Sequence, residues 1–323
     1  MGLLHAGILN ALPACEVVSI AEKESILIRF AKKLLPNLSF YPNVGEMLAR
    51  EQELDAVYVT TPISSHLPIL REIVANRRKV ALFVEKPLAS NYHDAMAIVD
   101  LTRRPDLKTM MGFQKRFSPI FQKAKQLLQQ GILGELNKFE SYSYVSDVQK
   151  EGKGWRFVAG QGGAVLDLGP HLIDLLLWYF GEPVEVDGTK GSLHSKEVDD
   201  FAHCKLKFER GFEGTLDVSW SIDGYRIPET GLSVIGTNGK LQVTDDYLEL
   251  ELYSNASAMN AGKYRFSKPE FRSGVDFLIG DPEYCLEDKY FVDCILEAKT
   301  PEPDFGAGLR VNQIIERIRD STR

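Results

Sequence analysis

Hydrophobic and polar residues alternate in a regular order along the first third of the chain. Short apolar runs of strand length are separated by longer segments whose apolar residues recur every three or four positions. The first pattern predicts β-strands and the second predicts amphipathic helices. Strands are expected at 16–21, 56–60, 80–84 and 109–112, and helices at 2–11, 25–35, 44–50, 68–76 and 92–102. This order is typical of a parallel sheet with crossover helices.

After residue 113 the pattern changes to several strands in direct succession. A helix at 118–130 precedes strands expected at 137–145, 201–208, 213–221, 231–235 and 248–253, with a turn at Thr237-Asn238-Gly239. Helices at 172–180, 284–298 and 309–319 are expected to cover one face of this sheet. The other face would expose apolar surface, so we expect it to pack against a second subunit in a homodimer or homotetramer.

The two patterns divide the chain into two domains. A length of 323 residues also favours two, at about 150 residues per domain. The predicted fold class is α/β, with a doubly wound Rossmann-type dinucleotide-binding domain over residues 1–113. An α+β domain with a large open, mostly antiparallel sheet follows over 114–323, for substrate binding and oligomerisation. The hydrophobic fraction of 44% and charged fraction of 26% are those of an ordinary soluble globular protein.

Charge and cysteine usage narrow the class of protein further. A net charge of -7 disfavours a nucleic-acid partner, which needs a clustered cationic surface. The longest apolar runs are too short for a membrane span of about 20 residues, and the N-terminus does not resemble a secretory signal. The four cysteines are scattered without a C-x-x-C pair, which suits buried thiols in a reducing compartment. We expect a cytoplasmic protein with no metal site and no membrane partner.

The chain opens in what is expected to be the first helix of the dinucleotide domain. Gly2 would then be the last glycine of a G-x-G-x-x-G turn, while the first strand and the two earlier glycines are absent from the sequence. That strand normally lies at the centre of the sheet, so its loss would leave backbone groups of both neighbours unpaired. Two explanations stay open: an upstream in-frame segment that ends in G-x-G-x-x, or a degenerate cofactor site.

Polar residues follow three of the predicted strands of the first domain. Glu22 follows the second strand about 20 residues after Gly2, where a carboxylate can accept hydrogen bonds from an adenosine ribose, although Glu22 could instead cap the next helix. Lys23 beside it could tolerate a 2′-phosphate. The next predicted strand ends in Thr60-Thr61-Pro62, followed by His66, and the strand after it ends in Glu85-Lys86. Both strand ends lie at the sheet edge where ligands bind.

The segment from Gly162 to Asp174 carries the strongest chemical signal. Asp167 and His171 flank a glycine-proline turn at the start of an apolar helix, so a carboxylate and an imidazole can converge there. Asp174 lies one helical turn after His171. An imidazole exchanges protons near neutral pH, and the glycines allow a ligand to approach closely, which favours a catalytic over a structural histidine.

Four motifs occur in the order of a known family. T-P-x-x-x-H begins at Thr61, E-K-P-L at Glu85, G-F-x-x-R-F-x-P at Gly112 and G-G-x-x-x-D-x-G-x-H-x-x-D at Gly162. The chain thereby resembles the glucose-fructose oxidoreductase, inositol 2-dehydrogenase and rhizopine catabolism superfamily, over all of its length except the missing first strand. The resemblance implies an NAD-dependent oxidoreductase, with NADP also possible, that acts on a secondary hydroxyl of a sugar, cyclitol or nucleotide-sugar.

The resemblance also implies roles for single residues. His171 would act as general base, Asp167 would orient and support its imidazolium, and Lys86 would bond the reacting oxygen. Substrate contacts are expected from Asp167, His171 and Asp174, and from four residues on nearby connections, Gln114, Arg116, Trp155 and Arg156, of which Arg116 and Trp155 could equally pack the domains. Cofactor contacts are expected from Gly2, Glu22, Thr60, Thr61, Pro62, His66, Glu85 and Lys86.

Two other functions stay open. One is a non-catalytic sugar-binding or regulatory protein that kept the fold and lost cofactor affinity. The other is a reductase for a different cyclic carbonyl, such as a tetrapyrrole or an imine, since related two-domain enzymes share E-K-P. The D-x-G-x-H segment favours polyols.

Overall fold

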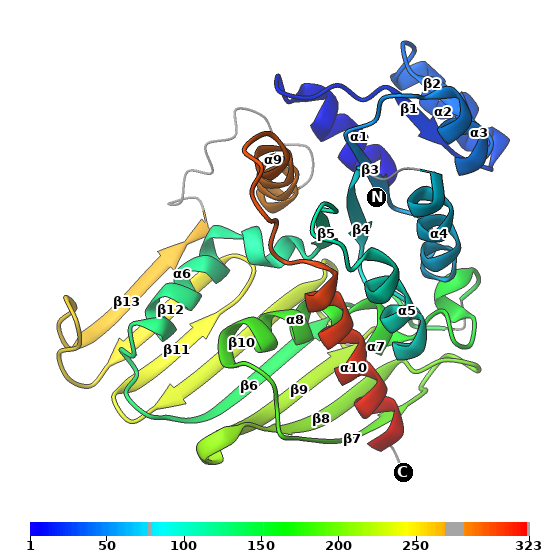
Figure 1. Ribbon diagram of the computed structural model, residues 1–323. Coiled ribbons are helices and arrows are strands. Elements are labelled where there is room, and N and C mark those ends of the chain that lie inside the picture. Colours follow the sequence, from blue (N-terminus) through cyan, green and yellow to red (C-terminus); the bar gives the residue numbers. More distant parts are fainter. Residues whose placement is uncertain (77–78, 151, 269–280, 322–323) are drawn as a thin grey trace. The chain divides into compact units, whose positions relative to one another are not determined.

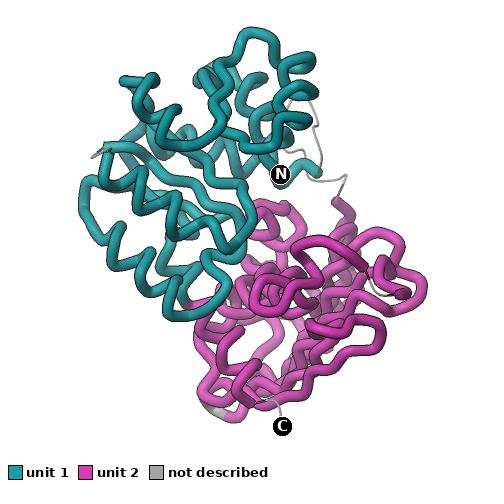
Figure 2. The backbone as a smooth tube through the Cα atoms, turned by 90° about the vertical axis from the view of Figure 1, so that its right-hand side faces the viewer, with its two compact units in different colours: residues 1–112, 275–309 teal, residues 113–274, 310–323 magenta. Residues whose placement is uncertain are grey.

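A computed structural model describes residues 1–76, 79–150, 152–268 and 281–321. The chain forms two compact units, which Figure 2 shows in different colours. The first comprises Met1–Gly112 and Val275–Leu309, and the second comprises Phe113–Gly274 and Arg310–Arg323. In the part of the chain that the structure describes, no helix combines the length and the apolar character needed to cross a bilayer.

The first unit is built on parallel strands. Strands β3 (Ala56–Val59), β4 (Ala81–Glu85) and β5 (Thr109–Gly112) form one sheet in that order, and every residue of β4 is buried. Strands β1 (Ser19–Ala21) and β2 (Ser39–Tyr41) form a second parallel sheet. Among the described residues β1 pairs only with β2, so the unit holds two short sheets rather than one continuous sheet.

Helices cover both faces of the three-stranded sheet, as expected for a doubly wound fold (Figure 1). Helices α4 and α5 lie together on one face, while α1 and α9 contact each other on the face that carries Tyr58 and Phe83. The helices of this unit are α1 (Gly2–Ala11), α2 (Ser25–Leu34), α3 (Val44–Arg50), α4 (His66–Asn76), α5 (Tyr92–Thr102) and α9 (Pro282–Leu296).

Local sequence fixes where two of these helices begin. Asn43 precedes α3 and its Oδ1 accepts the backbone N–H of Glu46 at 2.8 Å, while Asn91 does the same before α5 with Asp94 at 2.9 Å. The Oδ1 bond satisfies one backbone donor that each helix leaves open, and each asparagine also donates its side-chain amide to the carboxylate of the same acidic residue.

The expected division at residue 113 agrees with the change of unit at Gly112, but the assignment of all later residues to the second domain was wrong. Helix α9 packs on the first unit, where Phe291 contacts Tyr58 and Phe83 at ring distances of 5.7 and 5.8 Å. The carbonyl of Pro303 accepts the N–H of Met111, at the free edge of β5. The apolar pattern of a helix does not show which sheet it packs on. The sequence therefore could not reveal that the chain returns to the first unit at α9.

The second unit is an eight-stranded sheet in the order β13-β12-β11-β10-β6-β9-β8-β7. Its strands are β6 (Leu136–Tyr144), β7 (Glu185–Gly191), β8 (Phe201–Lys207), β9 (Glu213–Ser219), β10 (Glu229–Gly236), β11 (Gly239–Val243), β12 (Tyr247–Leu252) and β13 (Gly262–Ser267). The β6–β9 pair is parallel and all other pairs are antiparallel, which confirms the mostly antiparallel sheet.

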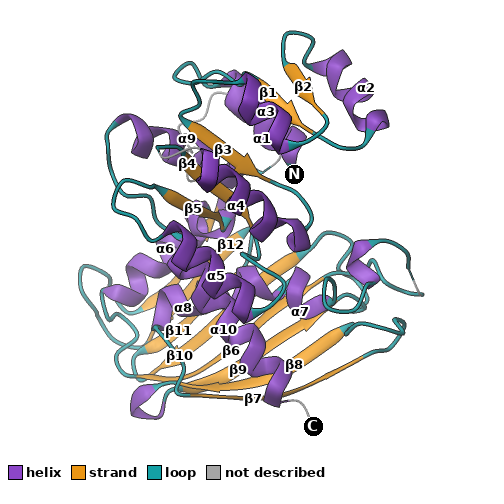
Figure 3. Ribbon diagram, turned by 45° about the vertical axis from the view of Figure 1, so that its right-hand side comes forward, coloured by secondary structure: helices purple, strands orange, loops and turns teal. Residues whose placement is uncertain are grey.

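One face of this sheet is covered by helices (Figure 3). They are α6 (Pro119–Gln129), α8 (Gly169–Phe180) and the part of α10 (Phe305–Ser321) from Arg310 onward, and the short helix α7 (Ala164–Asp167) lies against β8 and β9. The core between helices and sheet is aromatic: Phe139, Phe180, Phe208 and Phe212 contact one another with ring centroids 4.8 to 5.8 Å apart.

The uncovered face of the sheet is polar, so the expectation of exposed apolar surface was wrong. Ion pairs join neighbouring strands, including Lys205–Glu213 at 2.7 Å and Lys207–Glu185 at 2.6 Å. Tyr142 and Tyr144, both on β6, stack with ring centroids 4.8 Å apart. Apolar and polar residues alternate along each strand. The apolar residues face the helices and form the hydrophobic core, so the charged residues lie on the uncovered face.

Candidate active site

In the first unit, the start of α1 lies against the end of β3. A Cβ atom on Gly2 would come within 2.9 Å of the Thr60 hydroxyl, so only glycine fits at this point without a shift of Thr60. The first turn of α1 contains no acidic residue. Its open N–H groups and the positive end of its dipole therefore suit an anionic group.

The turn after β3 is held by a buried histidine. The His66 ring is fully buried, with Nδ1 3.1 Å from the Leu88 carbonyl oxygen and Nε2 3.0 Å from the Thr61 carbonyl oxygen. Burial lowers the pKa of His66, so the ring is neutral and can donate to one of the two carbonyls. The sequence predicted a cofactor contact for His66. In the structure the ring instead joins the Thr61-Pro62 turn to the segment after Lys86.

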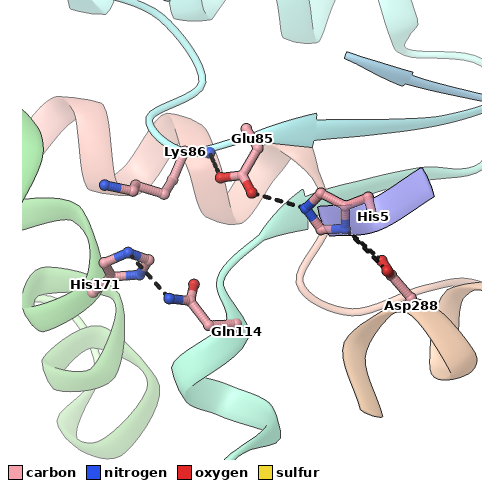
Figure 4. Close-up of polar contacts among 6 residues, drawn as sticks. All are labelled: His5, Glu85, Lys86, Gln114, His171 and Asp288. Carbon is pink, nitrogen blue, oxygen red and sulfur yellow. Dashed lines mark hydrogen bonds and ion pairs between the residues drawn. The ribbon is translucent and has the colours of Figure 1, made fainter. Parts of the chain in front are cut away.

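Glu85, at the end of β4, belongs to a buried polar chain that also contains His5 and Asp288 (Figure 4). His5 Nε2 lies 3.0 Å from Glu85 Oε1, and His5 Nδ1 lies 2.8 Å from Asp288 Oδ1. The backbone N–H of Lys86 donates to Glu85 Oε2 at 3.1 Å. Both carboxylates and the ring are shielded from water, with exposed fractions of 7% or less.

The charges in this chain follow from its contacts. Burial alone would lower the pKa of His5, but the hydrogen bonds and charges of Asp288 and Glu85 outweigh it and raise the pKa to about 9. Burial also works against the ionised form of Glu85, yet His5 and Lys86 together lower the pKa of that carboxyl. Burial raises the pKa of Asp288. At neutral pH the ring is an imidazolium between carboxylates.

Lys86 and Glu22 are the remaining polar candidates of this unit. The Lys86 side chain is partly exposed, and Figure 4 shows it extending away from the Glu85 carboxylate. Glu22 Oε1 accepts the backbone N–H of Glu24 at 2.9 Å. This bond closes the turn before α2. Glu22 therefore has the local structural role that the sequence offered as the alternative to a ribose contact.

In the second unit, two glycines shape the segment that leads to Asp167. A Cβ atom on Gly162 would meet the Arg156 carbonyl oxygen at 1.8 Å, and one on Gly163, whose φ is +110°, would meet Asp199 Oδ1 at 2.5 Å. Asp199 Oδ2 accepts the N–H of Val165 at 2.8 Å and so caps the first turn of α7. These glycines therefore serve close packing of the segment, in addition to any access for a ligand.

Asp167 ends α7 and accepts bonds from two side chains. Trp220 Nε1 donates to Asp167 Oδ2 at 3.1 Å, and Arg156 Nη2 lies 2.8 Å from the same oxygen. The guanidinium of Arg156 also lies over the Trp220 ring, 4.7 Å from its centroid, and pairs with Asp147 at 2.9 Å. Arg156 and Asp167 thus form part of one ion-paired cluster.

His171 stands in the first turn of α8, beside Gln114 (Figure 4). Gln114 Nε2 lies 3.5 Å from His171 Nε2, and Gln114 is buried. Gln114 belongs to the short helix Gln114–Phe117, which contacts α8. A side-chain amide beside a ring nitrogen can orient the imidazole.

Arg116 and Asp174 differ from the expected substrate contacts. Nε and Nη2 of Arg116 donate to the two carboxylate oxygens of Asp174, at 2.7 and 2.6 Å. Asp174 is 1% exposed. This pair joins two helical segments inside the unit, so neither group is free to recognise a substrate directly. Trp155, by contrast, is 43% exposed and offers an aromatic face.

Several residues of these clusters were not expected from the sequence. His5 bonds the candidate residue Glu85, and Trp220 bonds the candidate residue Asp167. Asp288 in turn bonds His5, and Asp199 accepts the N–H of Val165 near Asp167. His5 carried one usable signal, since it is a histidine on an apolar helix beside the predicted cofactor turn. The other three lie outside the motifs, and only the folded chain brings them to the site.

Comparison with known proteins agrees with this architecture. A model described as "Oxidoreductase family, NAD-binding Rossmann fold" (GFO_IDH_MocA) matches residues 2–113, and a GFO/IDH/MocA C-terminal domain model matches residues 121–242. The chain is similar to Oxidoreductase P35 of Formosa agariphila, 29% identical over 56% of this chain and 57% of that protein. It spans a little over half of that relative's length.

Two further relatives carry names with a defined chemistry. The chain is 24% identical to scyllo-inositol 2-dehydrogenase (NAD(+)) of Bacillus subtilis, over 77% of this chain and 69% of that protein. The structure of levoglucosan dehydrogenase in complex with NADH and levoglucosan matches with a TM-score of 0.85 and 21% identity, over 99% of this chain and 92% of that one. Two family models over two successive units, with the same architecture, place this chain in the GFO/IDH/MocA family of oxidoreductases.

Proposed function

We propose that this protein oxidises a secondary hydroxyl of a sugar, cyclitol or nucleotide-sugar, with NAD as the hydride acceptor. The observation that carries the proposal is the placement of His171 in the first turn of α8 beside Gln114, in a chain of this oxidoreductase family. Relatives named as inositol and sugar dehydrogenases support the class of substrate.

The residues of the first unit fit a dinucleotide. Gly2 allows the start of α1 to approach Thr60, and the N–H groups of that first turn suit a pyrophosphate. Thr60, Thr61 and Pro62 would line the same edge, and Glu22 would bond the adenosine ribose in place of Glu24. His66 and Glu85 support this edge from within. When bound, a nicotinamide supplies the acceptor for hydride.

The chain's own residues would handle the proton and the substrate oxygen. His171 would accept the hydroxyl proton at a ring nitrogen, and Gln114 would hold the ring in the orientation for that transfer. Lys86 would donate a hydrogen bond to the reacting oxygen, where negative charge develops. Arg156, held by Asp167 and Asp147, and the exposed face of Trp155 would contact the substrate's other hydroxyls.

One observation favours a second function, a sugar-binding protein without catalysis. Within the described residues the parallel strands of the first unit form two sheets instead of one. A cofactor site built across one continuous sheet would be weakened by this division. The proposed dehydrogenase and this alternative differ in one property, the affinity for NADH.

The test is a titration of the protein with NADH and NADPH, followed by NADH formation on a panel of cyclitols and aldoses. Saturable NADH binding together with substrate-dependent NADH formation supports the dehydrogenase. Sugar binding without NADH binding, measured by calorimetry on the same sample, would replace it with the second function.

We also infer a homo-oligomer and a cytoplasmic location. The polar, ion-paired face of the second unit's sheet, with its stacked tyrosines, would form the contact in place of the apolar surface first expected. The four cysteines are all free, which suits a reducing compartment. Light scattering that gives only the 36.3 kDa monomer at micromolar concentration would contradict the oligomer.

A further inference from the structure

We propose that His5 is a positioning residue for Lys86, because its ring holds the Glu85 carboxylate against the Lys86 backbone from inside the first unit. The inference rests on the proposed function, in which Lys86 bonds the reacting oxygen. It assigns a task to a histidine and to an aspartate, Asp288, that lie outside the family motifs described above.

The contacts form an unbroken chain from α9 to the end of β4 (Figure 4). Asp288 accepts from His5 Nδ1 with both oxygens, at 2.8 and 3.0 Å. His5 Nε2 bonds Glu85 Oε1 at 3.0 Å, and Glu85 Oε2 accepts the Lys86 N–H at 3.1 Å. Glu85 Oε1 thus bonds the His5 ring, and Glu85 Oε2 fixes the backbone from which the Lys86 side chain leaves.

Both ring nitrogens of His5 face carboxyl groups, and both donate when these groups are ionised. A neutral imidazole has one donor, whereas an imidazolium has two. The other titratable groups near the ring are Tyr58 on β3 and Tyr284 and Glu287 on α9, and none of them adds a cation. The charge on His5 is therefore a positive charge in direct contact with both Glu85 and Asp288.

Packing prevents the ring from turning away. The His5 ring lies 5.1 Å from Phe83, 5.7 Å from Tyr58 and 6.3 Å from Tyr284, and it is 1% exposed. Removal of its two donors would leave the buried Glu85 carboxylate without its hydrogen-bonded cation, at a cost that favours reorientation or protonation of that group. Either change weakens the acceptor of the Lys86 N–H and loosens the backbone at Lys86.

The test compares three proteins: the parent chain, His5→Leu, which fills the space without donors, and His5→Gln, which keeps one neutral donor. Amide hydrogen exchange is measured at Lys86, with the buried β8 amide of Ala202 in the second unit as the internal control. His5→Leu should speed exchange at Lys86 by about tenfold or more, because the N–H loses its acceptor. His5→Gln should restore part of the protection, and exchange at Ala202 should stay unchanged.

Kinetics and cofactor binding give an independent readout. Misplacement of Lys86 should lower kcat by about 10- to 100-fold in His5→Leu, while the Kd for NADH and the KM for substrate change less than about threefold. His5→Gln should recover part of kcat. If His5→Leu does not fold, His5→Gln alone decides, since it should still show faster exchange at Lys86 and a lower kcat than the parent.

The outcomes separate this inference from the proposed function. Faster exchange at Lys86 in His5→Leu than in the parent, with a parent chain that forms no NADH, would support the positioning role and reject the proposed function. Unchanged exchange and unchanged kcat in folded His5→Leu or His5→Gln would overturn the positioning role. Stoichiometric Zn²⁺ binding by the parent chain, lost in His5→Leu, would also overturn it, because His5, Glu287 and Asp288 would then serve as ligands instead of carrying a proton.

Discussion

The guanidinium of Arg116 binds the carboxylate of Asp174 through two parallel hydrogen bonds, from Nε to Oδ2 at 2.7 Å and from Nη2 to Oδ1 at 2.6 Å. Asp174 is 1% exposed, and the Arg116 guanidinium also lies 5.6 Å from the Trp178 ring. The pair therefore joins α8 to the short helix that carries Gln114. It anchors the helix that also carries His171.

Loss of either partner should destabilise the second unit. Asp174→Asn or Arg116→Met should lower the free energy of unfolding by about 3–5 kcal/mol, because each leaves a buried charge or donor without its partner. Arg116→Lys should lose stability as well, since an ammonium cannot make the forked contact. Urea denaturation measures each change, and the double variant Arg116→Met/Asp174→Leu, which removes both charges, should recover much of the loss. If the Asp174→Asn protein were as stable as the parent but had an altered substrate preference, Asp174 would contact the substrate instead of stabilising the fold.

The helices and the buried strands of this fold follow closely from the sequence. The expected ranges for α1, α3, α5 and β5 match the observed bounds, because asparagine caps, apolar spacing and short apolar runs are local signals. Strands β2, β7, β11 and β13 were missed. β2 is only three residues long, and β7 and β13 are polar edge strands with the sequences EVDGTKG and GKYRFS, so they lack the apolar runs that mark a buried strand.

The candidate site was predictable as far as its motifs reach. Asp167 and His171 come from one continuous segment, so their nearness follows from chain order. The partners of Asp167 do not, because Trp220 lies 53 positions away along the chain and only the sheet brings it close. A carboxylate in a motif does not show whether it bonds a histidine or an arginine, and that choice depends on distant residues.

The Arg156–Asp167 ion pair offers a test of what Asp167 does. If Asp167 acts mainly by holding Arg156, Asp167→Asn and Arg156→Ala should each lower kcat/KM, and the double variant should be little worse than the poorer single one. If Asp167 supports the charge of His171, Asp167→Asn alone should shift the acid limb of the pH–rate profile. We expect the first pattern, because Arg156 Nη2 lies 2.8 Å from Asp167 Oδ2. Additive effects of the two single changes would contradict it.

Cofactor preference tests the role of Glu22. A carboxylate that bonds the ribose repels a 2′-phosphate, so we expect a kcat/KM with NAD at least about tenfold above that with NADP. Glu22→Gln should narrow this ratio, while Glu24→Gln, two residues away, should leave it unchanged. If both variants keep the parental ratio, Glu22 serves only the turn that its bond to the Glu24 N–H closes.

The raised pKa of His5 predicts how stability depends on pH. Its folded-state pKa of about 9 lies above the usual value of 6.5, because the hydrogen bonds to Asp288 and Glu85 outweigh the effect of burial. Its stabilisation should therefore be complete below about pH 6.5, on the order of 3 kcal/mol, and disappear as the pH rises through about 9. Urea unfolding of the parent and of His5→Gln should show a gap that is widest near pH 6 and narrows by pH 10. A gap of constant size would mean that His5 is neutral in the folded protein.

The decisive test of the proposed chemistry is His171→Ala in protein shown to bind NADH. Turnover should fall by about two to four orders of magnitude, the usual contribution of a positioned acid–base group, while the Kd for NADH stays near the parental value. Gln114→Ala should have a smaller effect, because it frees the ring without removing it. His93→Ala provides the matched control, since the side chain of His93 is 87% exposed on α5. Melting temperatures of all variants separate lost chemistry from lost folding. If folded His171→Ala kept near-parental turnover, His171 would be a structural residue of the helix start, and the proton would have to leave through another group.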